Sequence, residues 1–312
     1  KLPPLLSNIL IRRTRNDILR WYGVDAETHQ RVDPDNFAPY RRGEKRAYVF
    51  VADKQQYFPK RTLQNIEYQI EKTYKGLYKK LRDYLSPLQA NNHFEQQVFP
   101  GMGANLPGLT YARYGLWRYV KPEKQNKPPY NELQRAGINL RGLMRVSLFK
   151  RLESSIEAFR CTLKRMIQTH EAFITALDQG IVPAGEDAQR LLYESDRYEE
   201  QELFDALSQV SGKYNLGDFL GDALRSDVLH DLSILREMYD LVKPIGPKQD
   251  DKLQTLNTWL NTAQKFDRPL SSRKCLIFTS YADTARYLYD NLNPKRDTDI
   301  EVIFGNDKDK AT

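Results

Sequence analysis

Three short groups of basic and hydroxyl side chains could contact the phosphates of a nucleic acid. They are Arg12, Arg13 and Arg15; Lys150 and Arg151; and Thr279, Ser280 and Tyr281. Arginine and lysine neutralise phosphate charge, and hydroxyl groups hydrogen-bond phosphate oxygens without reading the bases. The third group follows an apolar run that predicts a strand, and open α/β sheets bind ligands at the carboxyl ends of their strands. We therefore treat all three groups as candidate nucleic-acid contacts.

Each group also has a purely structural interpretation, and the sequence leaves both open. The arginines between Arg12 and Arg15 can form a solvated helix end. Lys150 and Arg151 can cover the polar side of a long helix, with Glu153 three residues after Lys150 and close enough to pair with it. The hydroxyls at 279–281 can simply cap a turn.

The sequence contains no complete site for phosphoryl transfer. A P-loop requires G-x-x-x-x-G-K-[ST], whose backbone amides and lysine hold the phosphates, and no such string occurs. Gly101-Met102-Gly103 lacks a following Gly-Lys and a flanking strand, so we interpret it as a loop. Two cysteines and four scattered histidines predict neither a disulfide framework nor a metal site. We predict no catalytic, cofactor-binding or metal-binding residue in this chain.

The composition limits the class of protein. The 312 residues are enough for two domains, and 40% hydrophobic with 29% charged residues favours long helices with wide solvated faces over a compact barrel. The net charge of +7 would attract a polyanion. No run approaches the roughly 20 apolar residues that cross a bilayer. The start has neither an initiator Met nor a signal sequence, so we expect a segment of a longer intracellular protein without a membrane partner.

Apolar residues at three- and four-residue steps predict several helices. The strongest spans 140–177, and further helices are expected over 71–88, 222–241 and 251–262. The prolines and glycines of 89–130 predict a long irregular segment, either a functional insertion or partly disordered, with one short helical candidate at 111–120. The acidic group at 194–202 has the composition of a solvated surface.

Two parts of the chain predict strands. Residues 48–51 and 63–68 are β-prone and could pair as a small hairpin. Residues 275–279 form an apolar run typical of a strand buried on both faces; a helix at 283–292 and a second such strand at 300–304 follow. These three elements predict one right-handed βαβ unit. One unit cannot make a sheet covered on both faces, so we expect the domain to continue past residue 312.

Three segments together resemble Swi/Snf-type DNA-dependent ATPases, a branch of the superfamily-two helicases. They are LIRRTR at 10–15 with Asp17-Ile18, LFKRLESS at 148–155 with Ala158-Phe159, and KCLIFTSY at 274–281 with Thr284-Ala285. The first is similar to the exit from the first RecA-like lobe, the second to the interlobe helix of bacterial members, and the third to the motif that opens the second lobe. Their order along the chain is also that of the family, although nothing in it matches residues 89–130.

The resemblance implies a mainly α fold, with a partial α/β unit at the C-terminus belonging to the second RecA-like lobe of a P-loop NTPase, and a small β ornament near the N-terminus. Residues 1–22 would be the tail of the first lobe, 23–248 a helical bridge, and 249–312 the start of the second lobe. The parent protein would be a cytoplasmic, nucleoid-associated bacterial motor that uses ATP and Mg to move on double-stranded DNA. This chain would carry no complete ATP site.

Two alternatives remain open. The chain could be a non-enzymatic helical scaffold or adaptor of a nucleic-acid-associated complex that merely ends in an α/β cap. It could also belong to a subunit of a restriction or phage-defence complex, which would differ in partners rather than in motor chemistry.

Overall fold

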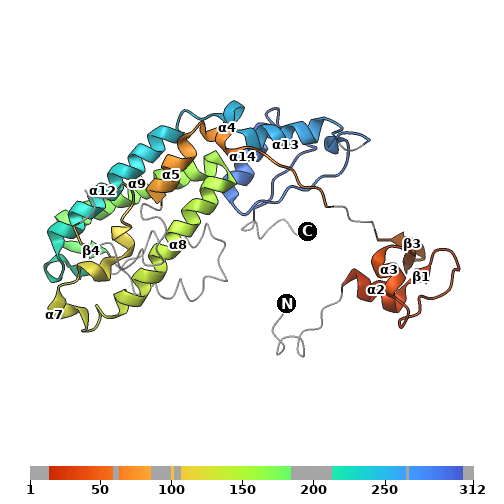
Figure 1. The fold of residues 1–312 in the computed structure, drawn as a ribbon, viewed down its shortest axis with the longest axis horizontal. Coiled ribbons are helices and arrows are strands. Elements are labelled where there is room, and N and C mark those ends of the chain that lie inside the picture. Colours follow the sequence, from red (N-terminus) through yellow and green to blue (C-terminus); the bar gives the residue numbers. More distant parts are fainter. Residues whose placement is uncertain are drawn as a thin grey trace. The chain divides into compact units, whose positions relative to one another are not determined.

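The computed structural model describes residues 14–58, 63–85, 100–101, 107–183, 213–264 and 267–304, and the chain divides into two compact units, Lys1–Ile66 and Glu67–Thr312. The described part is mainly helical, with two small antiparallel sheets (Figure 1). Several predictions fall wholly or partly outside the described residues: the contacts of Arg12 and Arg13, residues 89–99 and 102–106 of the irregular segment with the Gly101-Met102-Gly103 loop, and the acidic surface at 194–202.

The first unit combines two short helices with a three-stranded sheet. Helix α2 (Arg15–Tyr22) begins at Thr14, which forms a reciprocal capping box with Asp17, and helix α3 spans Ala38–Arg42. The sheet order is β1 (Val24–Asp25), β2 (Ala47–Val51) and β3 (Lys54–Tyr57), with both pairs antiparallel. Ala52 and Asp53 join β2 to β3 with φ of 46° and 61°, left-handed backbone that suits a two-residue hairpin turn.

The predicted hairpin is confirmed at its first strand and wrong at its second. Strand β2 covers the expected run, but it pairs with Lys54–Tyr57 and not with 63–68, where no strand forms. The two-residue turn places Lys54–Tyr57 directly opposite β2, and Leu63 is exposed.

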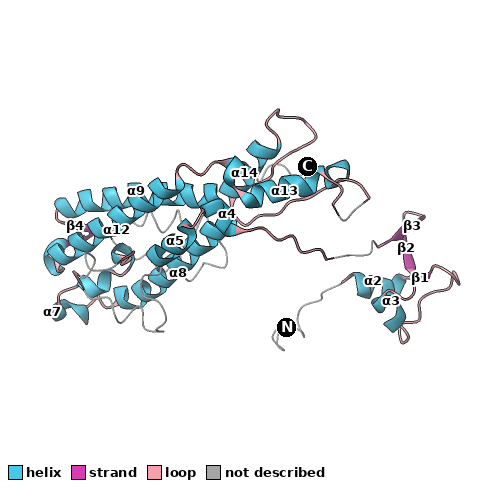
Figure 2. Cartoon of the chain, turned by 45° about the horizontal axis from the view of Figure 1, so that its top comes forward, coloured by secondary structure: helices cyan, strands magenta, loops and turns pink. Residues whose placement is uncertain are grey.

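The second unit is built around three long helices. Helix α8 spans Glu132–Ser154, α9 spans Ile156–Asp178, and α12 spans Gly221–Val242. Figures 1 and 2 show them running side by side along this unit, with α9 turning back from the end of α8. The apolar stripe predicted along 140–177 is confirmed as core, with buried members on both helices: Leu148, Leu152, Ile156, Phe159, Leu163, Phe173 and Leu177.

The single long helix predicted over 140–177 is wrong, because Ser155 interrupts it. Its backbone is extended (φ −157°, ψ 153°), so it ends α8 and begins α9. The Ser155 hydroxyl accepts a hydrogen bond from the backbone N–H of Ala158 at 3.1 Å. Serine side chains offer the backbone such a local alternative to the helical bond, and apolar periodicity cannot reveal it.

Shorter helices complete the unit. The segment predicted at 71–88 is helical in its described part, but the single helix is wrong. It forms α4 (Ile70–Tyr74) and α5 (Leu77–Leu85), separated by Lys75 and Gly76 in left-handed conformation. Helices α13 (Asp251–Asn261) and α14 (Ala282–Leu292) confirm two more predictions, as α12 does. A short helix, α7 (Pro122–Gln125), precedes α8, and strands β4 (Ile181–Pro183) and β5 (Lys213–Asn215) pair antiparallel.

Residues 108–120 of the predicted irregular segment are packed into the core. They contain 3₁₀ turns at Ala112–Tyr114 and Leu116–Tyr119 in place of the helix expected at 111–120. Two carboxylates of α12 hold this segment, Asp231 through backbone N–H groups and Asp227 through a side-chain hydroxyl. Asp231 accepts from the N–H of Thr110 (2.6 Å) and of Ala112 (2.9 Å), and Asp227 accepts from the hydroxyl of Tyr119 (2.8 Å).

The predicted βαβ unit is not formed among the described residues. Residues 275–279 and 300–304 make no strand ladder there, and only the intervening helix α14 is present. Leu276 and Phe278 are 83% and 89% exposed, where burial on both faces was predicted. A strand requires neighbours for its N–H and C=O groups, and no described segment supplies them.

Candidate functional site at the junction of α8, α9 and α14

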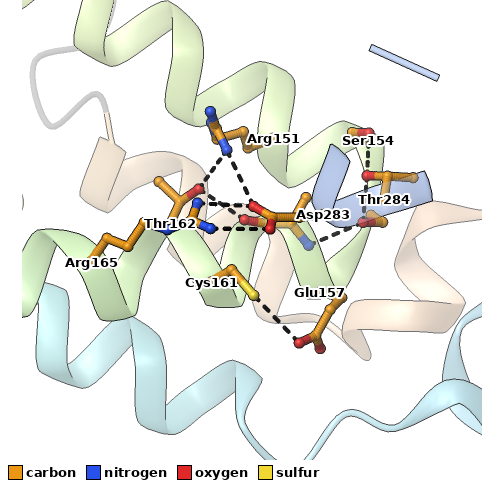
Figure 3. A network of polar contacts seen from close by, with 10 residues as sticks. Arg151, Ser154, Glu157, Cys161, Thr162, Arg165, Asp283 and Thr284 are labelled. Atoms are coloured by element: carbon orange, nitrogen blue, oxygen red, sulfur yellow. Dashed lines mark hydrogen bonds and ion pairs between the residues drawn. The ribbon is translucent and has the colours of Figure 1, made fainter. Parts of the chain in front are cut away.

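A polar network joins the end of α8 to the start of α14 through a buried arginine. Figure 3 shows the Arg151 side chain pointing toward Thr162 and Asp283. This side chain is fully buried, and its guanidinium carbon lies 4.7 Å from the ring centroid of Tyr281, the residue before α14. Its Nη1 donates to the hydroxyl of Thr162 on α9 at 2.9 Å. A guanidinium over an aromatic face is attracted by the ring quadrupole, more strongly when both are desolvated.

Asp283, in the first turn of α14, is the acidic centre of this network. Two nitrogens of Arg165 on α9 donate to its two carboxylate oxygens, at 2.9 and 3.1 Å, and Arg151 forms an ion pair with it at 3.8 Å. A two-point arginine–carboxylate contact fixes orientation as well as distance. The carboxylate also lies where the helix dipole favours negative charge. Asp283 therefore ties α14 to both α8 and α9.

Hydroxyl groups reinforce the same junction. The hydroxyl of Thr284 lies 3.0 Å from that of Ser154 and 2.9 Å from that of Ser155, across 130 and 129 residues of sequence. The interruption between α8 and α9 is thus also the docking point of α14.

A lysine of α13 caps the C-terminus of α8. The Lys252 Nζ donates to the carbonyl oxygens of Glu153 (3.0 Å) and Ser154 (2.9 Å), which have no partner within the helix. Burial lowers the pKa of the Lys252 ammonium. The cation stabilises the helix terminus, so it is engaged in structure rather than in proton transfer.

The one cysteine close to this network is Cys161, among the residues that the structure describes. Burial raises the pKa of the Cys161 thiol to about 11, so the sulfur is protonated near neutral pH. No group of side chains that could hold a metal ion occurs in the part of the chain that the structure describes.

The structure brings two of the three predicted groups together, but uses their members differently. Thr279 and Ser280 are exposed immediately before α14, and Lys150 is exposed on α8. Arg151 and Tyr281 are buried against each other, which leaves neither in contact with solvent as the chain is folded. Arg15 lies in the other unit, exposed, with its guanidinium 5.7 Å from the Phe58 ring.

Sequence reasoning missed Asp283, Arg165 and Lys252. One signal was available for Asp283: an acidic residue in the first turn of a predicted helix, directly after the Thr279-Ser280-Tyr281 group. Arg165 and Lys252 carried no such signal, because charged residues on helices usually face solvent.

The comparisons with known proteins found no matching family model, curated protein or solved structure. Within the described ranges, no helix is long and apolar enough to span a membrane.

Proposed function

We propose that this chain is part of a Swi/Snf-type, ATP-dependent DNA translocase, in which it supplies the helical bridge between lobes and part of the DNA track. The observation that carries the proposal is the meeting of two resemblance segments. Residues 148–155 and 274–281 are far apart in sequence, yet Arg151 stacks on Tyr281 and Ser154 contacts Thr284. A bridge that moves together with the start of the second lobe requires such a fixed junction.

The exposed apolar run before α14 also supports a second-lobe role. Leu276 and Phe278 would be covered if residues 275–279 joined a parallel sheet with helices on both faces. We propose that residues 249–312 form the first part of that RecA-like lobe in the longer protein. ATP and Mg would then be held by P-loop and acidic motifs that this sequence does not contain.

The proposed DNA contact is made by Thr279 and Ser280. Both are exposed and precede the N-terminus of an 11-residue helix, where hydroxyl and backbone N–H donors suit a phosphate oxygen. Such contacts are independent of base sequence, as a translocase requires.

A helical scaffold or adaptor is the alternative, and it has an observation in its favour. The α8, α9 and α12 helices pack against one another around a shared core of buried apolar side chains. In this case Leu276 and Phe278 would be covered by a protein partner.

The two functions can be separated in the longer protein. A translocase shows ATP hydrolysis stimulated by duplex DNA. Thr279→Ala and Ser280→Ala should each weaken DNA binding by about 0.5–1.5 kcal/mol, the net value of one hydrogen bond, whereas Ser271→Ala, at another exposed serine, is the matched control. The 312-residue chain alone should neither bind ATP tightly nor hydrolyse it. If the longer protein neither binds duplex DNA nor hydrolyses ATP in response to it, the adaptor function is favoured.

A further inference from the structure

The first unit presents a strip of aromatic rings across β2 and β3. Tyr48 and Tyr57 are directly opposite each other in the sheet, with ring centroids 5.4 Å apart, and Phe50 lies 5.4 Å from Tyr48 in an edge-to-face arrangement. Side chains alternate along a strand, so Tyr48 and Phe50 share one face. Tyr48 is buried at the base of the strip, while Phe50 is 57% and Tyr57 38% exposed.

Positive charge accompanies these rings. Arg46 is exposed one strand repeat before Tyr48, and its guanidinium carbon lies 5.4 Å from the Tyr57 ring centroid. The first unit, 1–66, has 13 Lys and Arg against 7 Asp and Glu, a formal charge of +6, whereas 67–312 has 35 against 34. Nearly all the excess charge of the chain therefore belongs to the unit that carries the aromatic strip.

Three acidic residues of the unit are occupied by internal contacts. Asp17 caps α2 through Thr14, the Tyr40 hydroxyl donates to Asp25, and Glu44 pairs with Arg42. These contacts hold the carboxylates in place without removing their charge, so the formal count of +6 already includes them. A second copy of this chain would bring the same positive charge to the strip, so the charge balance favours a polyanion as the occupant.

We propose that this strip, consisting of Arg46, Tyr48, Phe50 and Tyr57, is a binding site for single-stranded nucleic acid. Unpaired bases stack on Phe50 and Tyr57, Arg46 neutralises a phosphate, and the net positive charge of the unit attracts the strand. Bases in a duplex cover each other's faces, so the rings discriminate in favour of single strands. The site uses none of the residues in the α8–α9–α14 junction.

The whole 312-residue chain can be titrated against a fluorescein-labelled thymidine oligonucleotide and a duplex of equal length, followed by anisotropy. Single strands should bind more tightly than duplex. Phe50→Ala should weaken single-strand binding roughly 5- to 150-fold, the range for losing one base–aromatic stack. Phe50→Tyr should retain the affinity.

Val51→Ala is the matched control. Val51 is the next residue on β2, 58% exposed against 57% for Phe50, and its side chain lies on the opposite face. Arg46→Gln should lower the slope of log affinity against log salt by about 0.7, the loss of one phosphate contact. Circular dichroism should be unchanged in each variant.

The inference is overturned if Phe50→Ala weakens duplex binding as much as single-strand binding, or if Phe50→Ala and Val51→Ala have equal effects on single-strand binding. Neither result bears on the translocase proposal, whose readout is the effect of Thr279→Ala and Ser280→Ala on duplex binding and ATP hydrolysis in the longer protein. If Thr279→Ala and Ser280→Ala have no effect in the longer protein, the proposal for the aromatic strip is unchanged.

Discussion

The apolar stripe of α9 and the apolar run 275–279 are both strong hydrophobic signals, yet the folded chain buries one and exposes the other. Phe159 and Leu163 on α9 are fully buried, whereas Leu276 and Phe278 lie mostly in solvent. A helix satisfies its backbone internally and needs only a neighbouring face, which α8 and α12 provide. A strand needs hydrogen-bonding neighbours as well as a cover. A run of hydrophobic residues therefore predicts burial only where the rest of the chain supplies a packing face and, for a strand, hydrogen-bonding neighbours.

The largest expected effect is on the buried side of this comparison. Phe159→Ala should lower the free energy of unfolding by about 3–5 kcal/mol, because it removes an enclosed ring and leaves a cavity. Urea titration followed by far-UV circular dichroism measures it. Lys164→Ala, at an exposed position of the same helix, should have little effect. Equal stability of the two variants would show that the α9 stripe does not face a core.

The second effect concerns the carboxylate that holds the irregular segment in the core. Burial raises the pKa of Asp231 to about 7 from 3.8, so folding takes up a proton between these values. Its contribution to stability is full below about pH 4 and is lost as the pH rises through 7. Between about pH 4 and pH 7, the free energy of unfolding of the wild type should fall by roughly 1.4 kcal/mol per pH unit relative to that of Asp231→Asn.

A buried histidine provides the control of opposite sign. Burial lowers the pKa of His170 to about 3 from 6.5, while its Nδ1 contacts the Met166 carbonyl oxygen at 2.8 Å. Its contribution is present above pH 6.5 and is lost as the pH falls toward 3. The difference between wild type and His170→Gln should therefore change in the reverse direction with pH. Parallel curves for the two variants would contradict both assignments.

A smaller effect is expected at the junction that connects the two sides of the comparison. Asp283→Asn should cost about 1–3 kcal/mol, because Arg165 loses a two-point ionic contact and the buried Arg151 loses its ion pair. Asp290→Asn is the control within α14, since Asp290 pairs with Arg296 at the surface. If both variants unfold alike in urea, Asp283 does not couple α14 to the core.

The smallest effect is expected on the exposed side. Phe278→Ala in the 312-residue chain should change the unfolding free energy by less than about 0.5 kcal/mol, as is usual for surface positions. In the longer protein, a several-fold larger cost would indicate that residues 275–279 have gained the sheet that we propose. A large cost in the 312-residue chain itself would remove the contrast with Phe159.

Several of the helices in the described part of the chain can be predicted from local sequence patterns. Period and breaker residues predict α5, α9, α12, α13 and α14, because an amphipathic helix is a local property of the chain. The mainly helical class follows from the same signals. The absence of a P-loop string can be read directly from the sequence. The charge asymmetry of the two units is also present in the sequence, once the boundary between them is known.

Only the tertiary structure decided how these elements are used. The break at Ser155 depends on a hydrogen bond between its hydroxyl and the backbone N–H of Ala158. The burial of Arg151 depends on contacts with Tyr281 and Asp283, more than a hundred residues away in the sequence. Strand β2 pairs with β3 across a two-residue turn, whereas residues 275–279 pair with no strand among the described residues. Helical signals are local and survive in one sequence, whereas pairing and charge burial depend on which distant groups the fold brings within hydrogen-bonding distance.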